Sequence, residues 1–215
     1  MIPLFNEAAA IHDVVADVRT VFSRVICVDD ASSDGSAEQA ALAGAVVVRH
    51  PINLGQGAAL QTGITHALRD PRVDYVVTFD ADGQHQVADA EAMVARLMAD
   101  EADVVFGSRF LDQRTQAGRL RKAVLKVAVA YSNAATGVHL TDTHNGLRAF
   151  NRSVAVRLNL RQNRMAHASE VITQVGAMKA RYVEQPVHVL YTDYSRRKGQ
   201  HLLNSVNIIA EMIYK

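Results

Sequence analysis

The sequence has few of the features that assign a chain to a specialised class of protein. It contains one cysteine, Cys27, so an internal disulfide is excluded and a reducing compartment is expected. Its longest apolar run, residues 40–48, falls far short of the ~20 residues that a membrane span needs. Met1-Ile2-Pro3 leaves no room for a signal peptide. These features argue against a secreted disulfide scaffold and an integral membrane protein.

An excess of charge of either sign is also lacking. The 215 residues carry 23 Lys and Arg against 22 Asp and Glu, which gives a net charge of +1. This balance gives no reason to expect nucleic acid as a partner. With 49% hydrophobic and 21% charged residues, the composition is that of a globular protein that buries a core, and a disordered chain is excluded.

The first half of the chain alternates between two kinds of segment. Helical patterns with one apolar face lie between short, β-branched segments that are apolar on both faces, as buried parallel strands are. The predicted strands are residues 25–28, 45–48, 75–79 and 104–106. This alternation predicts an α/β fold with a mostly parallel central sheet flanked by helices and a ligand at the carboxyl ends of the strands.

The second half is less regular. Residues 109–121 are polar and basic and predict a loop, and residues 141–148 predict a polar turn. Helices are predicted for residues 123–135 and 201–215, and the alternation over residues 187–191 predicts a late strand. We find no internal repeat or linker, so a single domain over residues 1–215 is expected.

Acidic residues follow one of the predicted strands. Asp80 and Asp82 are two positions apart, so both side chains point to the same side of extended backbone. Two close carboxylates repel each other unless a cation lies between them, and a hard ion such as Mg²⁺ or Mn²⁺ fits oxygen ligands. Gln84 adds an amide oxygen to this metal hypothesis. The alternative is a simple turn, in which Asp and Gly are common.

A second polar cluster ends another strand at the matching edge. Asp29 and Asp30 point to opposite sides, so at most one of them would face the same ligand. A carboxylate that faces a crevice can accept from a ribose hydroxyl or a base N–H. No G-x-G-x-x-G motif follows the first strand, which weakens an NAD-binding hypothesis. The glycine-rich residues 53–57 open a helix and are explained either by approach to a phosphate or by a turn with a helix cap.

Taken in order, these motifs resemble glycosyltransferase family 2. The resemblance rests on residues 3–7, 28–36, 53–57, 80–84 and 107–109. Asp142 with residues 145–148, together with residues 194–199, resembles the branch that transfers sugars to polyprenyl and dolichyl phosphates. The similarity extends from Pro3 to about Gln200. It implies a GT-A fold, an inverting mechanism, a Rossmann-like nucleotide-sugar-binding half at 1–108 and an acceptor-binding half at 109–215.

The resemblance also implies roles for individual residues. The divalent ion, Mg²⁺ or Mn²⁺, would be held on the diphosphate by Asp80, Asp82 and Gln84. The acceptor phosphate would meet Arg109 and the basic loop to Arg121. Catalytic roles are implied for Asp82, Asp142, Arg109 and Arg197. The nucleotide-sugar would be bordered by Pro3, Asn6, Glu7, Asp30, Asn53, Gly55, Gln56, Asp80, Ala81 and Gly199.

The acceptor decides whether a general base is needed. A polyprenyl phosphate already carries about −1.5 to −2 charges at neutral pH and needs none. A sugar hydroxyl of a cell-envelope glycan needs a base, for which Asp142 and Glu170 are the candidates. Two other hypotheses stay open, namely a phosphatase with an Asp-x-Asp nucleophile and a non-catalytic protein that binds nucleotide-sugars. His85 is interpreted as a packed or solvated histidine.

A lipid acceptor implies a protein that docks on the cytoplasmic face of the cell membrane, directly or beside a separate membrane-protein partner. The predicted contacts are the loop of residues 109–121 and the apolar face of the last predicted helix. That face consists of Leu202, Val206, Ile209 and Ile213. The alternative for this helix is packing against the core.

Overall fold

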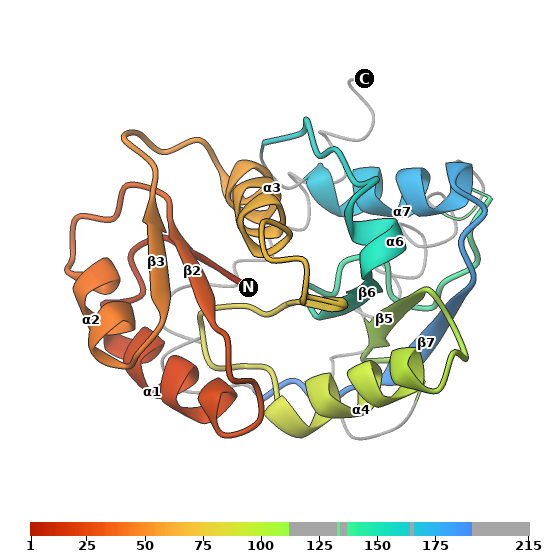
Figure 1. The fold of residues 1–215 in the computed structure, drawn as a ribbon, viewed down its shortest axis with the longest axis horizontal. Coiled ribbons are helices and arrows are strands. Elements are labelled where there is room, and N and C mark those ends of the chain that lie inside the picture. Colours follow the sequence, from red (N-terminus) through yellow and green to blue (C-terminus); the bar gives the residue numbers. More distant parts are fainter. Residues whose placement is uncertain (112–132, 134–136, 164–165, 191–215) are drawn as a thin grey trace, which may run out of the picture.

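The computed structural model describes residues 1–111, 133, 137–163 and 166–190. Seven strands of this part pair into two groups, in the orders β1-β2-β3 and β4-β6-β5-β7 (Figure 1). They are β1 (Ile2–Leu4), β2 (Ile26–Asp29), β3 (Val46–Arg49), β4 (Tyr75–Thr78), β5 (Val104–Ser108), β6 (Arg148–Asn151) and β7 (Tyr182–Pro186). Met1 joins the groups, because its amino group donates to the Val77 oxygen at 2.6 Å and its oxygen accepts from the Phe79 amide at 3.0 Å.

Most strand pairs are parallel, as the sequence predicts. β1, β2 and β3 pair in parallel, and so do β5 and β7, whereas β6 runs antiparallel between β4 and β5. The predicted α/β fold class is therefore confirmed, with β6 as the antiparallel exception.

Helices cover both faces of the sheet. They are α1 (Ala8–Arg19), α2 (Ser36–Leu42), α3 (Gln56–Ala67), α4 (Val87–Met98), α6 (Arg152–Ala155) and α7 (His167–Ala177). α1 and α4 contribute to one apolar cluster, and α3, α6 and α7 contribute to a second cluster on the opposite side (Figure 1). The apolar face predicted for α1 is buried, with Ile11, Val14, Val15 and Val18 all in the core. Met98, the last residue of α4, is 68% exposed.

Two of the predicted strands differ from the observed ones. The late strand lies at Tyr182–Pro186, just before the predicted residues 187–191. Its pairing with β5 ends at Pro186, although the Val187 amide still donates to the Ser108 oxygen at 2.9 Å. The prediction was misled because Val187 and Val189 are buried without belonging to a strand. β3 is an outer strand, so it is not buried on both faces, and Val46 is 53% exposed.

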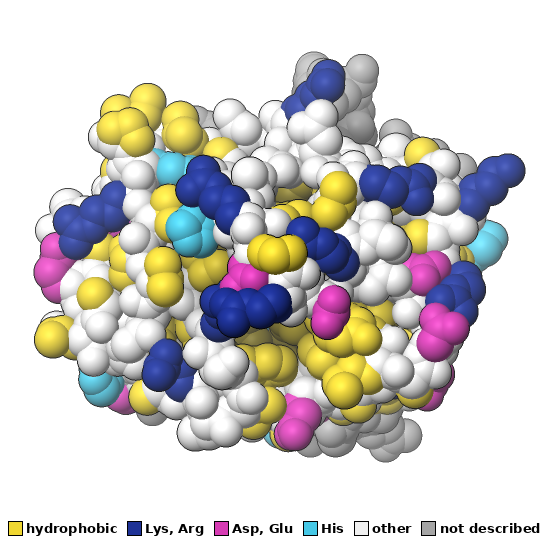
Figure 2. Space-filling view, in the orientation of Figure 1, with side chains coloured by type: hydrophobic (Ala, Val, Ile, Leu, Met, Phe, Trp, Pro, Cys, Tyr) yellow, Lys and Arg dark blue, Asp and Glu magenta, His cyan; other side chains and the backbone are white. Residues whose placement is uncertain are grey.

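The topology brings the carboxyl ends of β1, β2 and β4 to one edge of the sheet. The residues that follow these strands are residues 5–7, Asp30 and residues 79–82. Asn6 adopts a φ of 53° and Gly83 a φ of 72°, so the chain turns sharply at this edge. No helix in the described part of the chain is long and apolar enough to cross a membrane. The helices predicted over residues 123–135 and 201–215 lie outside the described residues, apart from residue 133. Side chains of both charge signs are scattered over the face that Figure 2 shows.

Candidate active site

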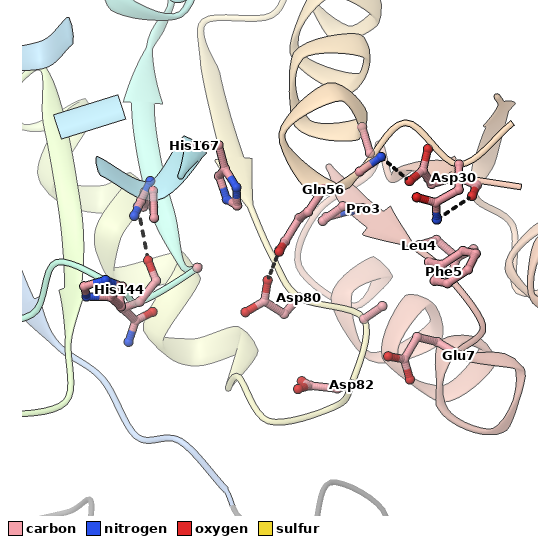
Figure 3. Close-up of a pocket in the computed structure, with 18 residues that line it drawn as sticks. Pro3, Leu4, Phe5, Glu7, Asp30, Gln56, Asp80, Asp82, His144 and His167 are labelled. Atoms are coloured by element: carbon pink, nitrogen blue, oxygen red, sulfur yellow. Dashed lines mark hydrogen bonds between the residues drawn. The ribbon is translucent and has the colours of Figure 1, made fainter. Parts of the chain in front are cut away.

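A cleft of about 570 Å³ opens at this edge of the sheet (Figure 3). Asp80 lies between two sides of the cleft in this view, with Leu4, Phe5 and Glu7 on one side and His144 and His167 on the other. We call the first side the near wall, which consists of Pro3, Leu4, Phe5, Glu7, Asp30 and Asn53. We call the second side the far wall, which consists of His144, Asn145, Gly146, Arg148, His167 and Ala168.

A second hollow of about 970 Å³ lies at the opposite, amino-terminal edge of the strands. Its lining includes Ile2, Ile26 and Tyr75, which begin β1, β2 and β4. None of the predicted site residues that the structure describes lines it. The smaller cleft at the carboxyl edge is therefore the candidate active site.

The two carboxylates that follow β4 have opposite electrostatic surroundings. Burial opposes ionisation of Asp80, but the hydrogen bond and charge of His85 outweigh it, so the pKa of Asp80 is below its ordinary value. The Asp80 Oδ2 atom lies 2.9 Å from His85 Nε2. Burial and then the charge of Asp80 raise the pKa of Asp82 to about 6. The Gln84 amide and the charge of His85 oppose this rise without outweighing it.

This pair fits a divalent cation. Oxygen donors suit Mg²⁺ or Mn²⁺, and a cation would remove the repulsion that raises the pKa of Asp82. Among the described residues, no group of three or more His, Cys, Asp or Glu side chains gathers to hold a metal. An ion on Asp80 and Asp82 would therefore take its other ligands from substrate oxygens and water, as Mg²⁺ commonly does.

Gln84 and His85 follow the acidic pair in the chain, and both are buried. Gln84 does not line the cleft, and its main-chain oxygen accepts from the Leu190 amide at 2.9 Å. The His85 ring packs edge-on against Phe79 with 5.6 Å between ring centroids. No described residue hydrogen bonds to His85 Nδ1, and Nε2 is the ring nitrogen that lies against Asp80.

Asp30 organises the near wall. It is 3% exposed, and its Oδ1 atom lies 2.8 Å from both His50 Nδ1 and the Leu54 amide nitrogen. Its Oδ2 atom accepts from the Gly55 amide at 2.7 Å, and Asn53 Nδ2 donates to its main-chain oxygen at 3.3 Å. The carboxylate thus shapes the loop between β3 and α3 at the same time as it lines the cleft.

The remaining residues predicted to bind the nucleotide-sugar are split by the structure. Pro3, Glu7, Gly55, Gln56 and Ala81 line the cleft, together with Asp30, Asn53 and Asp80. Asn6 does not, because its side chain is turned to the loop after β2, where Oδ1 accepts from the Ser33 amide at 3.0 Å. Arg197 and Gly199 lie outside the described residues.

Arg109 and Asp142 bind each other instead of lining the cleft. Arg109 Nε donates to Asp142 Oδ2 at 2.6 Å, and Arg109 Nη2 donates to Oδ1 at 2.9 Å. Burial opposes ionisation of Asp142, but the charge and hydrogen bonds of Arg109 lower its pKa. Glu170, the other candidate base, accepts from the main-chain amides of Arg161 and Gln162 and is also outside the lining.

The far wall contains charged and polar residues to which the sequence assigned no role. Arg148 is 4% exposed, and it donates through Nε to the Asn145 oxygen at 3.1 Å and through Nη2 to the Thr143 oxygen at 3.2 Å. Burial lowers its pKa to about 10, while Asp80 and Asp142 oppose this shift. The only sequence signal was that residues 145–148 resemble a family motif, which gives no side-chain direction. His167, on α7, had no signal.

The chain matches known proteins over most of its length. The model of a family described as glycosyl transferase family 2 matches residues 1–158. An uncharacterised protein of Methanocaldococcus jannaschii is 31% identical, with 99% of this chain and 89% of that protein covered. The UDP-N-acetylglucosamine–dolichyl-phosphate N-acetylglucosaminyltransferase of Methanococcus voltae is 28% identical, with 99% and 93% covered.

The fold also matches a solved structure. Glucosyl-3-phosphoglycerate synthase of Mycobacterium tuberculosis, in complex with Mn²⁺, UDP-glucose and phosphoglyceric acid, superposes with a TM-score of 0.72. The two proteins are 20% identical, and the match covers 99% of this chain and 77% of the other. This similarity shows a shared GT-A fold.

Proposed function

This chain belongs to glycosyl transferase family 2, and we propose that it transfers a sugar from a UDP- or GDP-linked donor to a polyprenyl phosphate. In this proposal Asp80 and Asp82 hold a divalent cation, Mg²⁺ or Mn²⁺, on the donor diphosphate. The chain is a glycosyltransferase that uses a nucleotide-sugar. The acceptor and the metal dependence are the proposed steps.

The observation that carries the metal assignment is the pair of carboxylates between the two walls. Asp82 is raised in pKa by its burial and by Asp80, so the pair is an acidic site that a cation would stabilise. A cation bound there would neutralise the charge that develops on the leaving nucleoside diphosphate. The near wall, with Pro3, Glu7 and Asn53, would then bind the nucleoside part of the donor.

The state of the two candidate bases favours a phosphate acceptor over a hydroxyl acceptor. A hydroxyl must lose a proton during attack on the anomeric carbon, whereas a phosphate oxygen is already negatively charged. Asp142 is bound by Arg109 at both oxygens, and Glu170 is bound by two main-chain amides. The Methanococcus voltae relative is named as a transferase to dolichyl phosphate, which supports the same conclusion.

A polyprenyl acceptor places the protein at the cytoplasmic face of the membrane, as a peripheral protein. We propose that the acceptor phosphate meets Arg109 and the basic residues that follow it, and that Arg197 and Gly199 close on the diphosphate. In this arrangement residues 1–108 supply most of the donor site and residues 109–215 most of the acceptor site.

The acceptor is tested with two lipids that differ only in the phosphate. The purified chain is incubated with Mn²⁺, UDP- and GDP-sugars and either a polyprenyl phosphate or the matching polyprenol in detergent. We expect a lipid-linked sugar, detected by mass spectrometry, from the phosphate alone. Product from the polyprenol, or free sugar from the donor without any lipid product, would overturn the proposed acceptor.

A further inference from the structure

The far wall has no role in the function proposed so far, yet it adjoins the proposed metal ligands. A Cβ atom added at Gly146 would collide with the Asp80 carboxylate, so this carboxylate lies directly against the main chain of the far wall. The Asp80 carboxylate and the far wall are therefore in van der Waals contact.

Covalent connectivity determines which part of the donor reaches the far wall. If the near wall binds the nucleoside and Asp80 and Asp82 hold the diphosphate, the next group along the donor is the sugar. The sugar is bonded to the second phosphate, so it must lie within about one hexose length of the cation. Figure 3 shows His144 and His167 on the side of Asp80 away from Leu4, Phe5 and Glu7.

The chemistry of the far wall suits a neutral, hydroxylated group better than a second phosphate. Arg148 is buried, and nearby Asp80 and Asp142 oppose the lowering of its pKa by burial. Its Nε and Nη2 groups donate to two main-chain oxygens of the loop before β6. Arg148 therefore holds this loop in place, and these two donor groups are already used within the protein.

His144 is the side chain of this wall that suits a sugar hydroxyl. Its Nδ1 atom lies 2.9 Å from Thr143 Oγ1, which fixes the ring and leaves Nε2 as the nitrogen for a ligand. Burial lowers the pKa of His144, and the charges of Arg148 and Arg109 add to the effect, against the influence of Asp142. The ring is thus neutral at neutral pH and hydrogen bonds a hydroxyl without adding charge.

We propose that the far wall is the subsite for the transferred sugar and that His144 Nε2 hydrogen bonds one of its hydroxyl groups. This assignment rests on the proposed function, because it takes the nucleoside and the diphosphate to lie where that function puts them. It makes His144 a residue that determines how strongly the sugar part of the donor contributes to binding.

The test compares each nucleotide with its sugar conjugate. Dissociation constants of UDP, UDP-glucose, UDP-N-acetylglucosamine, GDP and GDP-mannose are measured by calorimetry with Mn²⁺ for the wild type, H144A and H144Q. We expect H144A to weaken binding of the preferred nucleotide-sugar by about 3- to 10-fold, the loss of one hydrogen bond, while the free nucleotide is unchanged. H144Q should restore part of the loss. The control is H12A, at an exposed histidine of α1 outside the cleft.

Each outcome decides the assignment. Equal weakening of nucleotide and nucleotide-sugar by H144A, or weakening of neither, would overturn the sugar subsite while the proposed function stands. A rise in the KM for polyprenyl phosphate without a change in donor binding would instead make the far wall an acceptor site. Failure of every nucleotide and nucleotide-sugar to bind the wild type would overturn the proposed function, and the subsite with it.

Discussion

Removing the charge of Asp82 is expected to stabilise the metal-free protein while it abolishes metal-dependent transfer. The pKa of Asp82 rises from an ordinary 3.8 to about 6 in the folded chain, through burial and the charge of Asp80. A difference of this size between the folded and the unfolded chain corresponds to about 3 kcal/mol. Because the folded chain holds the proton more tightly, the ionised carboxylate is the destabilising form.

The sign of the pH dependence follows from this shift. Below pH about 4 Asp82 is protonated in both states and costs no stability, and as the pH rises toward 6 the unfolded chain ionises first. The full cost of about 3 kcal/mol applies above pH 6. D82N removes this cost, so at pH 7.5 in EDTA it should raise the free energy of unfolding by up to about 3 kcal/mol.

Denaturant unfolding in EDTA between pH 4 and pH 8 measures this effect for the wild type, D82N and the control D17N, at an exposed aspartate of α1. The difference between D82N and the wild type should grow from pH 4 to pH 6 and should shrink when Mn²⁺ is added, because the ion stabilises only the wild type. A D82N protein that is no more stable than the wild type in EDTA at pH 7.5 would refute the reasoning.

Three further predictions concern residues around the cleft. G146A should force the Asp80 carboxylate aside and weaken Mn²⁺ binding, measured by electron paramagnetic resonance, with the circular dichroism spectrum unchanged. R109A should lower the free energy of unfolding by roughly 3–5 kcal/mol, because it leaves the Asp142 carboxylate buried without the Arg109 guanidinium. The double variant R109A/D142L should lose less of this free energy, because it removes the buried charge as well. D30N should lower the free energy of unfolding by about 1–3 kcal/mol, since Asp30 accepts from two amides of the loop after β3. The expected signs are a lower melting temperature and faster proteolysis of that loop. An unchanged melting temperature in D30N or R109A would contradict these structural roles.

The acidic edge was predictable because two simple rules apply to it. Parallel strands end at the same edge of a sheet, and residues two apart in extended backbone share a side, so Asp80 and Asp82 follow from the sequence. Asp30 followed from the same reasoning, whereas the other predicted residues of the near wall rested on the family resemblance. One residue implied by that resemblance, Asn6, is turned into a neighbouring loop. Here local pattern and global topology agree.

The other half of the site was not predictable, because partner choice depends on contacts between distant segments. Arg109 and Asp142 are 33 positions apart, and no pattern in the sequence shows that they bind each other. Arg148 begins β6, whose antiparallel place between β4 and β5 is not encoded by any local periodicity. His144 lies in a polar turn, where the sequence indicates the type of residue but not the direction of its side chain.

The central claim is that a cation on Asp80 and Asp82 binds the diphosphate of a nucleotide-sugar. The most direct measurement is the thermal unfolding of the wild type with UDP- and GDP-sugars, with Mn²⁺ and with EDTA. A ligand at one hundred times its dissociation constant should add about 2.7 kcal/mol, or roughly 5–11 °C for a chain of this size. We predict this shift for one nucleotide class with Mn²⁺ and its loss with EDTA and in D82N. A shift of equal size in EDTA would contradict the account.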